Sequence, residues 1–381
     1  MVVADDDAAY VSLVNQLLDL VDELFAQDFE LFQSDTKVFH RMYLQCNRRA
    51  SAYTSAYNGC VAPQFDVAGV GLNATDTLLV VPRFPAYAGK VPFEREIVSP
   101  GGQVASALVA CSRLGLRAKY IGTLGDDERA RIQRASLRDA GINLDHVQTR
   151  PGCPNQSAYI IIDRSTGERT VLWSRPECLR IDPAEITPEQ ILCARLLHID
   201  GHDTPAVAHA ARIAHGAGIP VTVDVDTIYH GFDQVLPHVE YLIASSEFPT
   251  QWTNESDPPR ALELIQREYG MRVAAMTLGS HGALALENGR FHYSPAFVVN
   301  CVDTTGAGDV FHGAFCYSVL QGMGLADALD FSNAMAALNC TAMGARGGIG
   351  GVEAVRALMQ TAPRRAHPDL AGRMGRTAIS T

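Results

Sequence analysis

A regular alternation of short apolar runs with helical patterns, between residues 192 and 281, most constrains how this chain can fold. Residues 196–201 form an apolar run that ends in a polar turn, residues 206–215 follow a helical pattern closed by glycine, and residues 220–226 are the next apolar run. Such alternation is typical of a parallel sheet with helices on both faces. The sequence therefore predicts an α/β fold whose ligands bind at the carboxyl ends of the strands.

Acidic side chains fall at two of these predicted strand ends: Asp200, Asp224 and Asp226. A carboxylate at such a position either binds a ligand or caps the loop that follows. The sequence leaves both interpretations open.

Residues 303–309, with the sequence Asp-Thr-Thr-Gly-Ala-Gly-Asp, form the most specific motif in the chain. Its small residues let the backbone turn tightly and approach a ligand. Apolar residues recur at helical spacing from Val310 to Leu320, so the turn leads into a helix. The first amides of a helix lack partners within it and attract an anion, and Asp309 adds a carboxylate that can cap the helix or accept a proton. The motif suits phosphoryl transfer, although a capped helix start that serves packing alone would need similar residues.

The same seven residues closely resemble the signature of the ribokinase-like, or PfkB-type, sugar and nucleoside kinases. The resemblance covers about residues 65–355 and implies a three-layer αβα domain with a mostly parallel central sheet and a small β-sheet lid. It makes Asp309 the catalytic base. It assigns the anion hole to the three amides that precede this base, those of Gly306, Ala307 and Gly308.

The pattern Gly69-x-Gly71 imitates a dinucleotide-binding fingerprint, which would require a helix directly after it. Residues 76–82 are instead rich in β-branched side chains and end in proline, which indicates a second strand. The dehydrogenase interpretation is therefore disfavoured. The resemblance makes Asp76 a carboxylate that binds sugar hydroxyls, which suits a group able to accept two hydrogen bonds, with a simple turn residue as the alternative.

A double glycine precedes a helical stripe of apolar residues that begins at Val104. The family carries Gly-Gly here and, shortly after it, an Asn that contacts the substrate, whereas this chain has Ser106 at the place of that Asn. A hydroxyl is shorter and lacks the two donors of an amide, so the substrate contacts must differ. The acceptor site implied by the resemblance comprises Asn73, Asp76, Gly101, Gly102, Gln103 and Ser106.

Short alternating segments without helices between them occur near residues 77–100 and 156–172. Within the second segment, two apolar runs flank Ser165-Thr166-Gly167, which predicts a hairpin. The resemblance assigns these segments to the lid, which would close over the sugar and exclude water. Lids of this kind pair into dimers in several relatives, so a homodimer through the lid is one expectation, while the oligomeric state stays open.

On the nucleotide side, residues 273–282 resemble the strand and turn that line the ATP site. The resemblance assigns nucleotide contacts to Thr277, Gly279, Thr304 and Asn333, the last of them near adenine. The family's Asn-x-x-Glu motif, which organises Mg²⁺ and the phosphates, is not intact here. Glu247 is the nearest carboxylate, and Mg²⁺ usually keeps several waters and relies on substrate phosphates. Asp303 and the carbonyls of residues 344–350 would hold a monovalent cation such as K⁺.

The composition excludes several classes of protein. Of 381 residues, 47% are hydrophobic, enough for a sizeable core, and the net charge of −11 argues against a nucleic-acid partner. Nine cysteines are scattered without metal-binding spacing, which suits thiols in a reducing cytosol. Neither a signal peptide nor a stretch that would cross a membrane is evident. We therefore expect a cytoplasmic protein without a membrane partner.

The expected domain organisation is a helical and then loop-like extension of unassigned role at residues 1–64, a kinase domain at 65–360 and a polar tail at 361–381. The expected function is ATP-dependent phosphorylation of a sugar hydroxyl. A nucleoside kinase is the first alternative. A regulatory protein that only binds a sugar or nucleotide is the second, favoured by Ser106 and opposed by the intact Asp309. His312 is expected on the helix surface or in the core rather than in catalysis.

Overall fold

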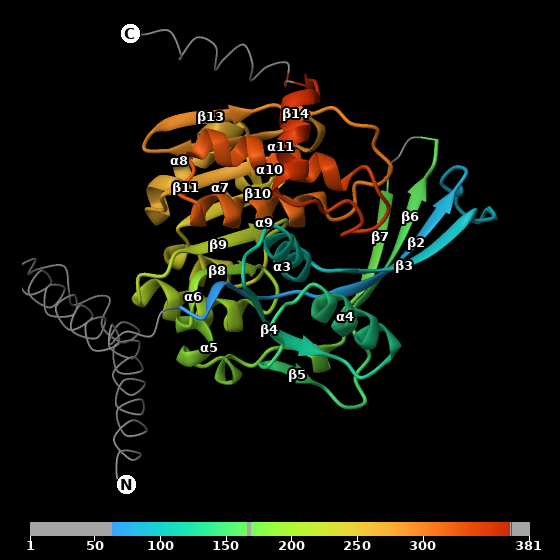
Figure 1. Ribbon diagram of the computed structural model, residues 1–381, viewed down its shortest axis with the longest axis horizontal. Helices are drawn as coiled ribbons and strands as arrows, with labels where there is room; N and C mark the ends of the chain where they lie inside the picture. The colour runs from blue at the N-terminus through green and yellow to red at the C-terminus, as the bar shows by residue number, and fades with distance from the viewer. Residues whose placement is uncertain (1–62, 166–168, 366, 368–381) are drawn as a thin grey trace, which may run out of the picture. The chain divides into compact units, whose positions relative to one another are not determined.

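The computed structural model describes residues 63–165, 169–365 and 367 (Figure 1). The extension predicted at residues 1–64 therefore lies outside the described residues, apart from its last two positions. The polar tail from residue 368 onward, and the tip of the hairpin at residues 166–168, lie outside them as well.

Within the described residues, a nine-stranded sheet forms the centre of the fold, in the order β13-β12-β11-β10-β9-β8-β1-β4-β5. The strands from β5 to β11 pair in parallel, and β12 and β13 continue the sheet antiparallel. The α/β fold with a mostly parallel sheet is thus confirmed. The strands are β1 (Phe65–Val70), β4 (Ala118–Leu124), β5 (Val147–Thr149), β8 (Ala194–Asp200), β9 (Val221–Val225), β10 (Tyr241–Ser245), β11 (Val273–Thr277), β12 (Ala283–Glu287) and β13 (Arg290–Ser294).

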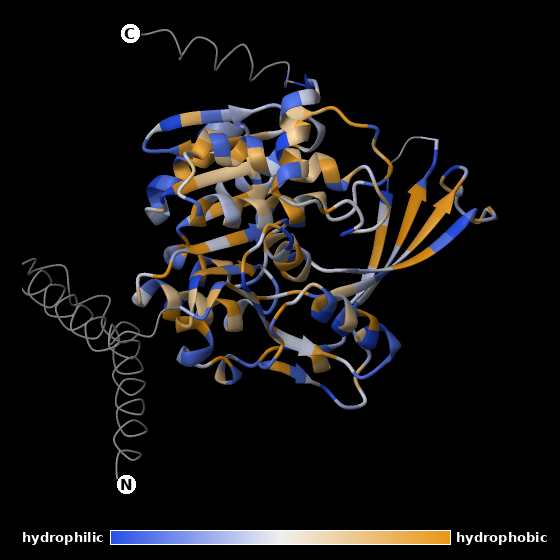
Figure 2. Cartoon of the chain, in the orientation of Figure 1, coloured by the Kyte–Doolittle hydropathy of each residue, from blue (hydrophilic) through white to orange (hydrophobic). Residues whose placement is uncertain are grey.

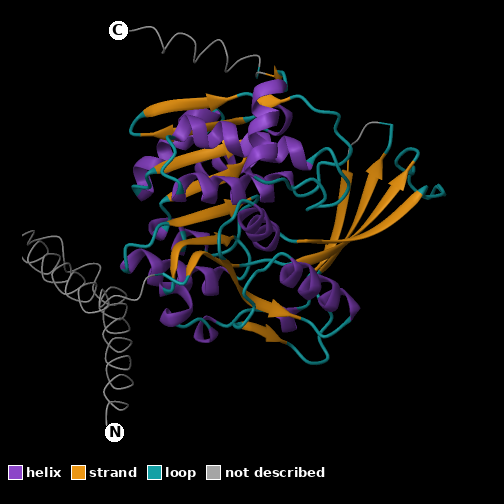
Figure 3. Cartoon of the chain, in the orientation of Figure 1, coloured by secondary structure: helices purple, strands orange, loops and turns teal. Residues whose placement is uncertain are grey.

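Helices cover both faces of this sheet (Figure 3). Side chains of a strand alternate between the two faces, so Leu242 and Ala244 of β10 join one apolar cluster, while Tyr241 and Ile243 join another. The first cluster packs α5 (Pro188–Leu192), α6 (Thr204–Gly216), α7 (Glu247–Thr253) and α8 (Pro258–Tyr269). The opposite face packs α3 (Gln103–Arg113), α9 (Ala307–Leu320), α10 (Leu325–Asn339) and α11 (Val352–Thr361).

A separate four-stranded sheet projects from the side of the main body (Figure 1). Its order is β3-β2-β6-β7, in which β2 and β6 pair in parallel and the outer pairs are antiparallel. This is the small sheet that the sequence predicts as a lid. Its strands are β2 (Ala74–Val81), β3 (Arg95–Gly101), β6 (Ser157–Asp163) and β7 (Arg169–Ser174). Against its base packs α4 (Glu128–Asp139).

Much of strands β2, β6 and β7 of the lid sheet is coloured as hydrophobic in Figure 2. One set of side chains forms a small buried cluster, composed of Leu78, Val80, Ala158, Ile160 and Ile162. Strand β7 is exposed along its whole length, and its apolar residues Val171, Leu172 and Trp173 are at least 44% exposed. The lid therefore has a small core of its own and a further apolar surface without cover.

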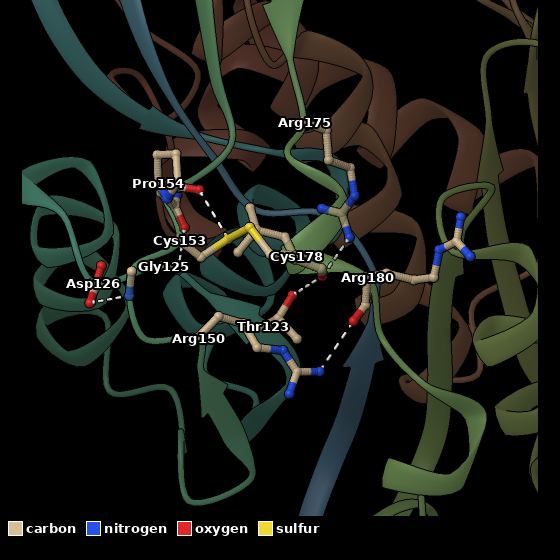
Figure 4. Close-up of a disulfide and its surroundings, with 12 residues drawn as sticks. Thr123, Gly125, Asp126, Arg150, Cys153, Pro154, Arg175, Cys178 and Arg180 are labelled. Carbon is tan, nitrogen blue, oxygen red and sulfur yellow. Dashed lines mark hydrogen bonds between the residues drawn. A yellow bond between two sulfur atoms is a disulfide. The ribbon is translucent and has the colours of Figure 1, made fainter.

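The lid hairpin is closed at its base by a disulfide between Cys153 and Cys178 (Figure 4). Cys153 precedes β6, and Cys178 follows β7 in the short helix η2 (Glu177–Leu179). The expectation that all nine cysteines are dispersed thiols is wrong for this pair, because β6 and β7 fold back on each other and bring residues 25 positions apart into contact. Among the other described cysteines, Cys111, Cys193, Cys301, Cys316 and Cys340 are free thiols.

The remaining short elements complete the described chain. The 3₁₀ helices besides η2 are η3 (Pro183–Glu185), η4 (Phe232–Gln234), η5 (Leu236–His238) and η6 (Gly279–His281). Strand β14 (Ala296–Phe297) pairs with β15 (Arg364–Arg365), so the start of the predicted polar tail contacts the main unit. In the part of the chain that the structure describes, every helix is too short or too polar to cross a membrane.

Candidate active site

A cavity of about 850 Å³ opens where the lid, the carboxyl ends of the central strands and the start of α9 meet. This is the edge at which parallel α/β sheets bind ligands. The lid contributes Asp76, Gln156, Arg169 and Trp173 to its wall, and α10 contributes Asn333. The strand ends contribute Asp224, Asp226, Ser245 and Thr277, and the glycine-rich turn contributes Thr304, Gly306, Ala307, Gly308 and Asp309.

The glycine-rich turn leads into α9 as predicted, with Gly306 at the N-cap. Gly306 has a φ of 74°, a backbone conformation that residues other than glycine rarely adopt. A Cβ at this position would overlap the carbonyl oxygen of Ala345 and lie 2.6 Å from its Cα, so close packing also requires glycine. The residues that begin α9 line the cavity, and the first amides of a helix have no acceptors within it. The Ala307 amide donates to the Thr304 carbonyl oxygen at 3.3 Å, and the turn brings the positive end of the helix dipole to the cavity.

Asp303 holds this turn in place from behind. Its Oδ1 accepts hydrogen bonds from the Thr305 amide at 2.9 Å and from the Thr305 hydroxyl at 2.7 Å, and its Oδ2 accepts one from the Gly344 amide at 2.8 Å. Asp303 is buried, so these bonds fix the turn to the loop after α10. Among the described residues, no cluster of three or more His, Cys, Asp or Glu side chains forms a metal site.

Asp309 lies in the first turn of α9, in the cavity wall. Burial, followed by the nearby charge of Asp224, raises the pKa of its carboxyl to about 6, while His312, Arg346 and Arg169 oppose the rise. Asp309 is therefore mostly ionised at neutral pH but remains close enough to its pKa to accept and release a proton.

Asp76, near the start of the lid strand β2, lines the same cavity. Burial and the charge of Asp309 raise the pKa of Asp76 to about 7, and Arg346 lowers it. A Cβ at Gly101 would overlap Asp76 Oδ2, so only glycine at the end of β3 leaves room for this carboxylate. The two carboxylates predicted from the sequence are thus brought to one cavity.

The other predicted acceptor residues divide into two groups. Gly102 and Gln103 line the cavity, and the Gln103 Oε1 is buried without a hydrogen-bond partner in the described structure. Asn73 and Ser106 are buried behind the wall instead. The Asn73 amide donates to the Tyr120 hydroxyl and to the Thr123 carbonyl oxygen, both at 2.7 Å. The Asn73 amide group is therefore used in hydrogen bonds within the protein.

Four of the predicted nucleotide residues line the cavity: Thr277, Gly279, Thr304 and Asn333. The Asn333 amide also donates to the Ser294 hydroxyl at 2.7 Å, which ties α10 to the end of β13. Glu247 is exposed at the start of α7, where it accepts a hydrogen bond from Gln251, and it is not part of the cavity wall. The structure does not bring Glu247 to the other site residues.

Sequence reasoning missed a buried pair beneath the cavity. His312 Nε2 lies 3.1 Å from Asp224 Oδ1, and both residues are buried and line the cavity floor. Burial raises the pKa of Asp224, but His312 and His198 outweigh this effect and hold it below its usual value. The position of His312 in the core was one of the two expected, while its pairing with Asp224 joins residues 88 positions apart, which spacing alone cannot reveal.

Sequence reasoning also missed Arg169, which reaches from lid strand β7 across the cavity. Its guanidinium donates a hydrogen bond to the Thr304 hydroxyl in the glycine-rich turn. Lid and turn are therefore in direct contact. In the sequence, the only signal for Arg169 was its position at the start of the second run of the predicted hairpin.

Comparison with known proteins matches residues 66–349 to the family described as pfkB family carbohydrate kinase. An ATP-dependent ribose-1-phosphate kinase from Halopiger xanaduensis is 28% identical over 273 residues, which cover 71% of this chain and 90% of the relative. A ribokinase from Schizosaccharomyces pombe is 30% identical over 264 residues, covering 65% of this chain and 83% of the relative. The structure of Arabidopsis thaliana ribokinase complexed with ribose and ATP superimposes with a TM-score of 0.65 at 21% identity, covering 78% of this chain and 99% of that one.

Proposed function

The chain belongs to the pfkB family of carbohydrate kinases, and on that premise we propose that its cavity transfers the γ-phosphoryl group of ATP to a hydroxyl group of a small sugar. The observation that carries this proposal is the convergence of Asp309, the amides after Gly306 and the lid carboxylate Asp76 on one cavity. Phosphoryl transfer needs a positioned acceptor, a base for its proton and fixed charge for the moving phosphoryl group.

Asp309 acts as the base. At neutral pH its carboxylate accepts the proton of the acceptor hydroxyl as the oxygen attacks phosphorus. The developing charge on the phosphoryl oxygens meets the N–H groups of residues 306–308 and the positive end of α9. Because Asp303 already holds this turn, little reorganisation is needed during the reaction.

Asp76 and Gln103 orient the acceptor. Asp76 accepts hydrogen bonds from sugar hydroxyls, and the unpartnered Gln103 Oε1 offers one further acceptor at the same wall. The lid places Trp173 and Arg169 over the cavity and limits the access of water to the phosphoryl group. Ser106 remains a proposed acceptor-side residue only through its contact with Arg346.

The nucleotide lies along Thr277, Gly279, Thr304 and Asn333 in this proposal. Asp226 and Ser245 are oxygen donors in the same wall, which fits Mg²⁺, an ion that prefers oxygen ligands and keeps several waters. When bound, Mg²⁺ would neutralise phosphate charge. The Asp303 carboxylate retains acceptor capacity beyond its protein hydrogen bonds, so a monovalent cation such as K⁺ at this loop is part of the proposal.

A homodimer through the lid is also part of the proposal. Leu172 and Tyr159, which pair across β7 and β6 and do not line the cavity, would lose their contact with water in such a dimer. Size-exclusion chromatography with light scattering of the wild type and of Leu172→Asp tests this. A monomeric wild type would contradict it.

The direct test of the function is a panel of pentoses, hexoses, sugar phosphates and nucleosides, incubated with ATP and Mg²⁺. We expect ADP and a phosphorylated product, identified by mass spectrometry, from at least one free sugar or sugar phosphate. Turnover of nucleosides alone would identify a nucleoside kinase instead. ATP binding without turnover of any acceptor would indicate a regulatory binding protein and overturn the proposal.

A further inference from the structure

Arg346 lies in the loop after α10, and its side chain runs beneath the double glycine on the acceptor side. The guanidinium donates from Nε to the Ser106 hydroxyl at 3.1 Å, from Nη1 to the Ser136 hydroxyl at 2.8 Å and from Nη2 to the Gly101 carbonyl oxygen at 2.7 Å. These partners belong to α3, α4 and β3. One guanidinium therefore joins three elements that surround the acceptor side of the cavity.

The loop that carries Arg346 also supports the phosphoryl side. The Ala345 backbone fills the space beside Gly306, and its carbonyl oxygen accepts a hydrogen bond from the Asn339 amide at 3.1 Å. The same amide donates to the Thr305 carbonyl oxygen at 3.2 Å. Because Ala345 and Arg346 are neighbours in the chain, a single short loop fixes the anion-binding turn and the floor of the acceptor site together.

Arg346 is the cation that both site carboxylates share. Asp76 lies against Gly101, whose carbonyl oxygen accepts a hydrogen bond from Arg346, and Asp309 follows the turn that packs on Ala345. Burial raises the pKa of Asp76 and of Asp309, and the Arg346 charge opposes both rises. Burial lowers the pKa of Arg346 to about 10, so it stays charged near neutral pH.

Other charged or titratable groups also act on the pKa of Asp76 and of Asp309, in both directions. Asp309 also faces Asp224, which raises its pKa, and His312 and Arg169, which lower it. Asp76 also faces Asp303, which raises its pKa, and Arg346 also faces Tyr120. Of the two arginines near Asp309, Arg169 lies on an exposed lid strand, whereas Arg346 is held by three hydrogen bonds. The fixed charge comes from Arg346.

Ser106 explains how the arginine fits. It is fully buried, and its short side chain leaves space for the guanidinium while its hydroxyl oxygen accepts the Nε–H. A longer side chain that carries an amide would occupy more of this space. The serine at this position and the arginine 240 residues later thus form one structural unit.

We propose that Arg346, seated on Ser106, Ser136 and the Gly101 carbonyl oxygen, is a positioning residue whose fixed positive charge acts on both Asp76 and Asp309 across the acceptor site. The inference rests on the proposed kinase function of this cavity. It adds to that function a device that couples the acceptor side to the phosphoryl side. Neither the acceptor nor ATP needs to touch Arg346 for this role.

The test is Arg346→Met, which keeps an unbranched stem and removes the charge. We expect the midpoint of the acid limb of kcat/KM to move upward by about one pH unit, since an opposite charge nearby shifts a carboxyl by this order. Arg346→Lys restores a charge and should return the midpoint toward the wild type even if stability stays lower. Arg138→Met, which removes an exposed arginine from α4, is the matched control and should leave the profile unchanged.

A second measurement does not depend on turnover. Carbon-13 NMR of protein labelled at aspartate carboxyls, with Asp309→Asn and Asp76→Asn spectra for assignment, follows both titrations directly. We expect both midpoints to rise in Arg346→Met and to recover in Arg346→Lys. Unchanged titrations in a folded Arg346→Met protein would overturn the inference, whatever its activity. A wild type without kinase activity but with the expected titration shifts would refute the proposed function and leave the electrostatic role of Arg346 standing.

Discussion

The central sheet and the lid bury their apolar side chains in different ways. Strands β8, β9 and β10 are buried nearly along their full length because helices cover both of their faces. Strand β7 of the lid is exposed throughout, and the lid has only a small apolar cluster of its own. The lid is instead held by specific links, the Cys153–Cys178 disulfide at its base and the Arg169 contact with Thr304 across the cavity.

This difference assigns separate roles to the two regions. The phosphoryl side is positioned by close packing around α9, so changes there should act on kcat. The acceptor side is positioned by a sheet that contributes little packing, so changes there should act first on stability of the lid and on KM for the acceptor. The predictions below test this division.

The largest effect is expected from Asp309→Asn, on the phosphoryl side. The amide cannot accept the hydroxyl proton, so kcat should fall by about 10³-fold, within the range for loss of a general base. The similar shape should leave ATP binding within about threefold of the wild type. Steady-state kinetics and calorimetric ATP titration measure the two quantities. A variant with full activity would contradict the role of Asp309 as the base and the assignment of kcat to the phosphoryl side.

Removal of the lid disulfide comes next. Cys178→Ser releases a loop of 25 residues, and loop closure of this size stabilises a fold by about 3 kcal/mol. Because the link lies at the base of the lid, KM for the acceptor should rise while kcat stays within about twofold. Denaturant unfolding with and without a dithiol reductant measures the loss of stability. The free energy of unfolding of the wild type should fall to that of the variant only in the presence of the reductant. A loss confined to kcat would contradict the prediction that changes in the lid act first on KM for the acceptor.

Gly306→Ala tests the packed side without changing a chemical group. The Cβ would meet the Ala345 backbone, and the φ of 74° is strained for alanine, so we expect a loss of about 2 kcal/mol and a lower kcat. Gly216→Ala is the matched control, because this helical glycine has open space around its Cβ. The control should be neutral or slightly stabilising. Thermal unfolding of both variants is the measurement. Equal melting temperatures of Gly306→Ala and Gly216→Ala would show that the turn is not packed as described.

How much the sequence could predict follows from the range of the interactions involved. The turn at residues 303–309 and the helix after it are local, so composition and spacing were enough to place Asp309 and its amides. Asp76 and Gly102 came from the resemblance and lie in the cavity. The contacts between Ser106 and Arg346, Asp224 and His312, and Cys153 and Cys178 join distant segments, and only the folded sheet order brings them together. Glu247 was placed by proximity in sequence to a strand end, but the first turn of α7 directs it outward.

The smallest effect expected is a shift in pH dependence, and it tests whether the two sides are electrostatically joined despite their different packing. Activity requires ionised Asp309, whose pKa is about 6, so kcat/KM should rise with pH through this region and be about tenfold lower at pH 5 than at its plateau. The Asp224 charge is one cause of the raised pKa, so Asp224→Asn should move the acid limb of the pH profile to lower pH. The sign follows because loss of a neighbouring negative charge favours the ionised carboxylate. A limb that moves to higher pH would mean that the effect of His312 on Asp309, which Asp224 supports through its contact with His312, outweighs the loss of the Asp224 charge.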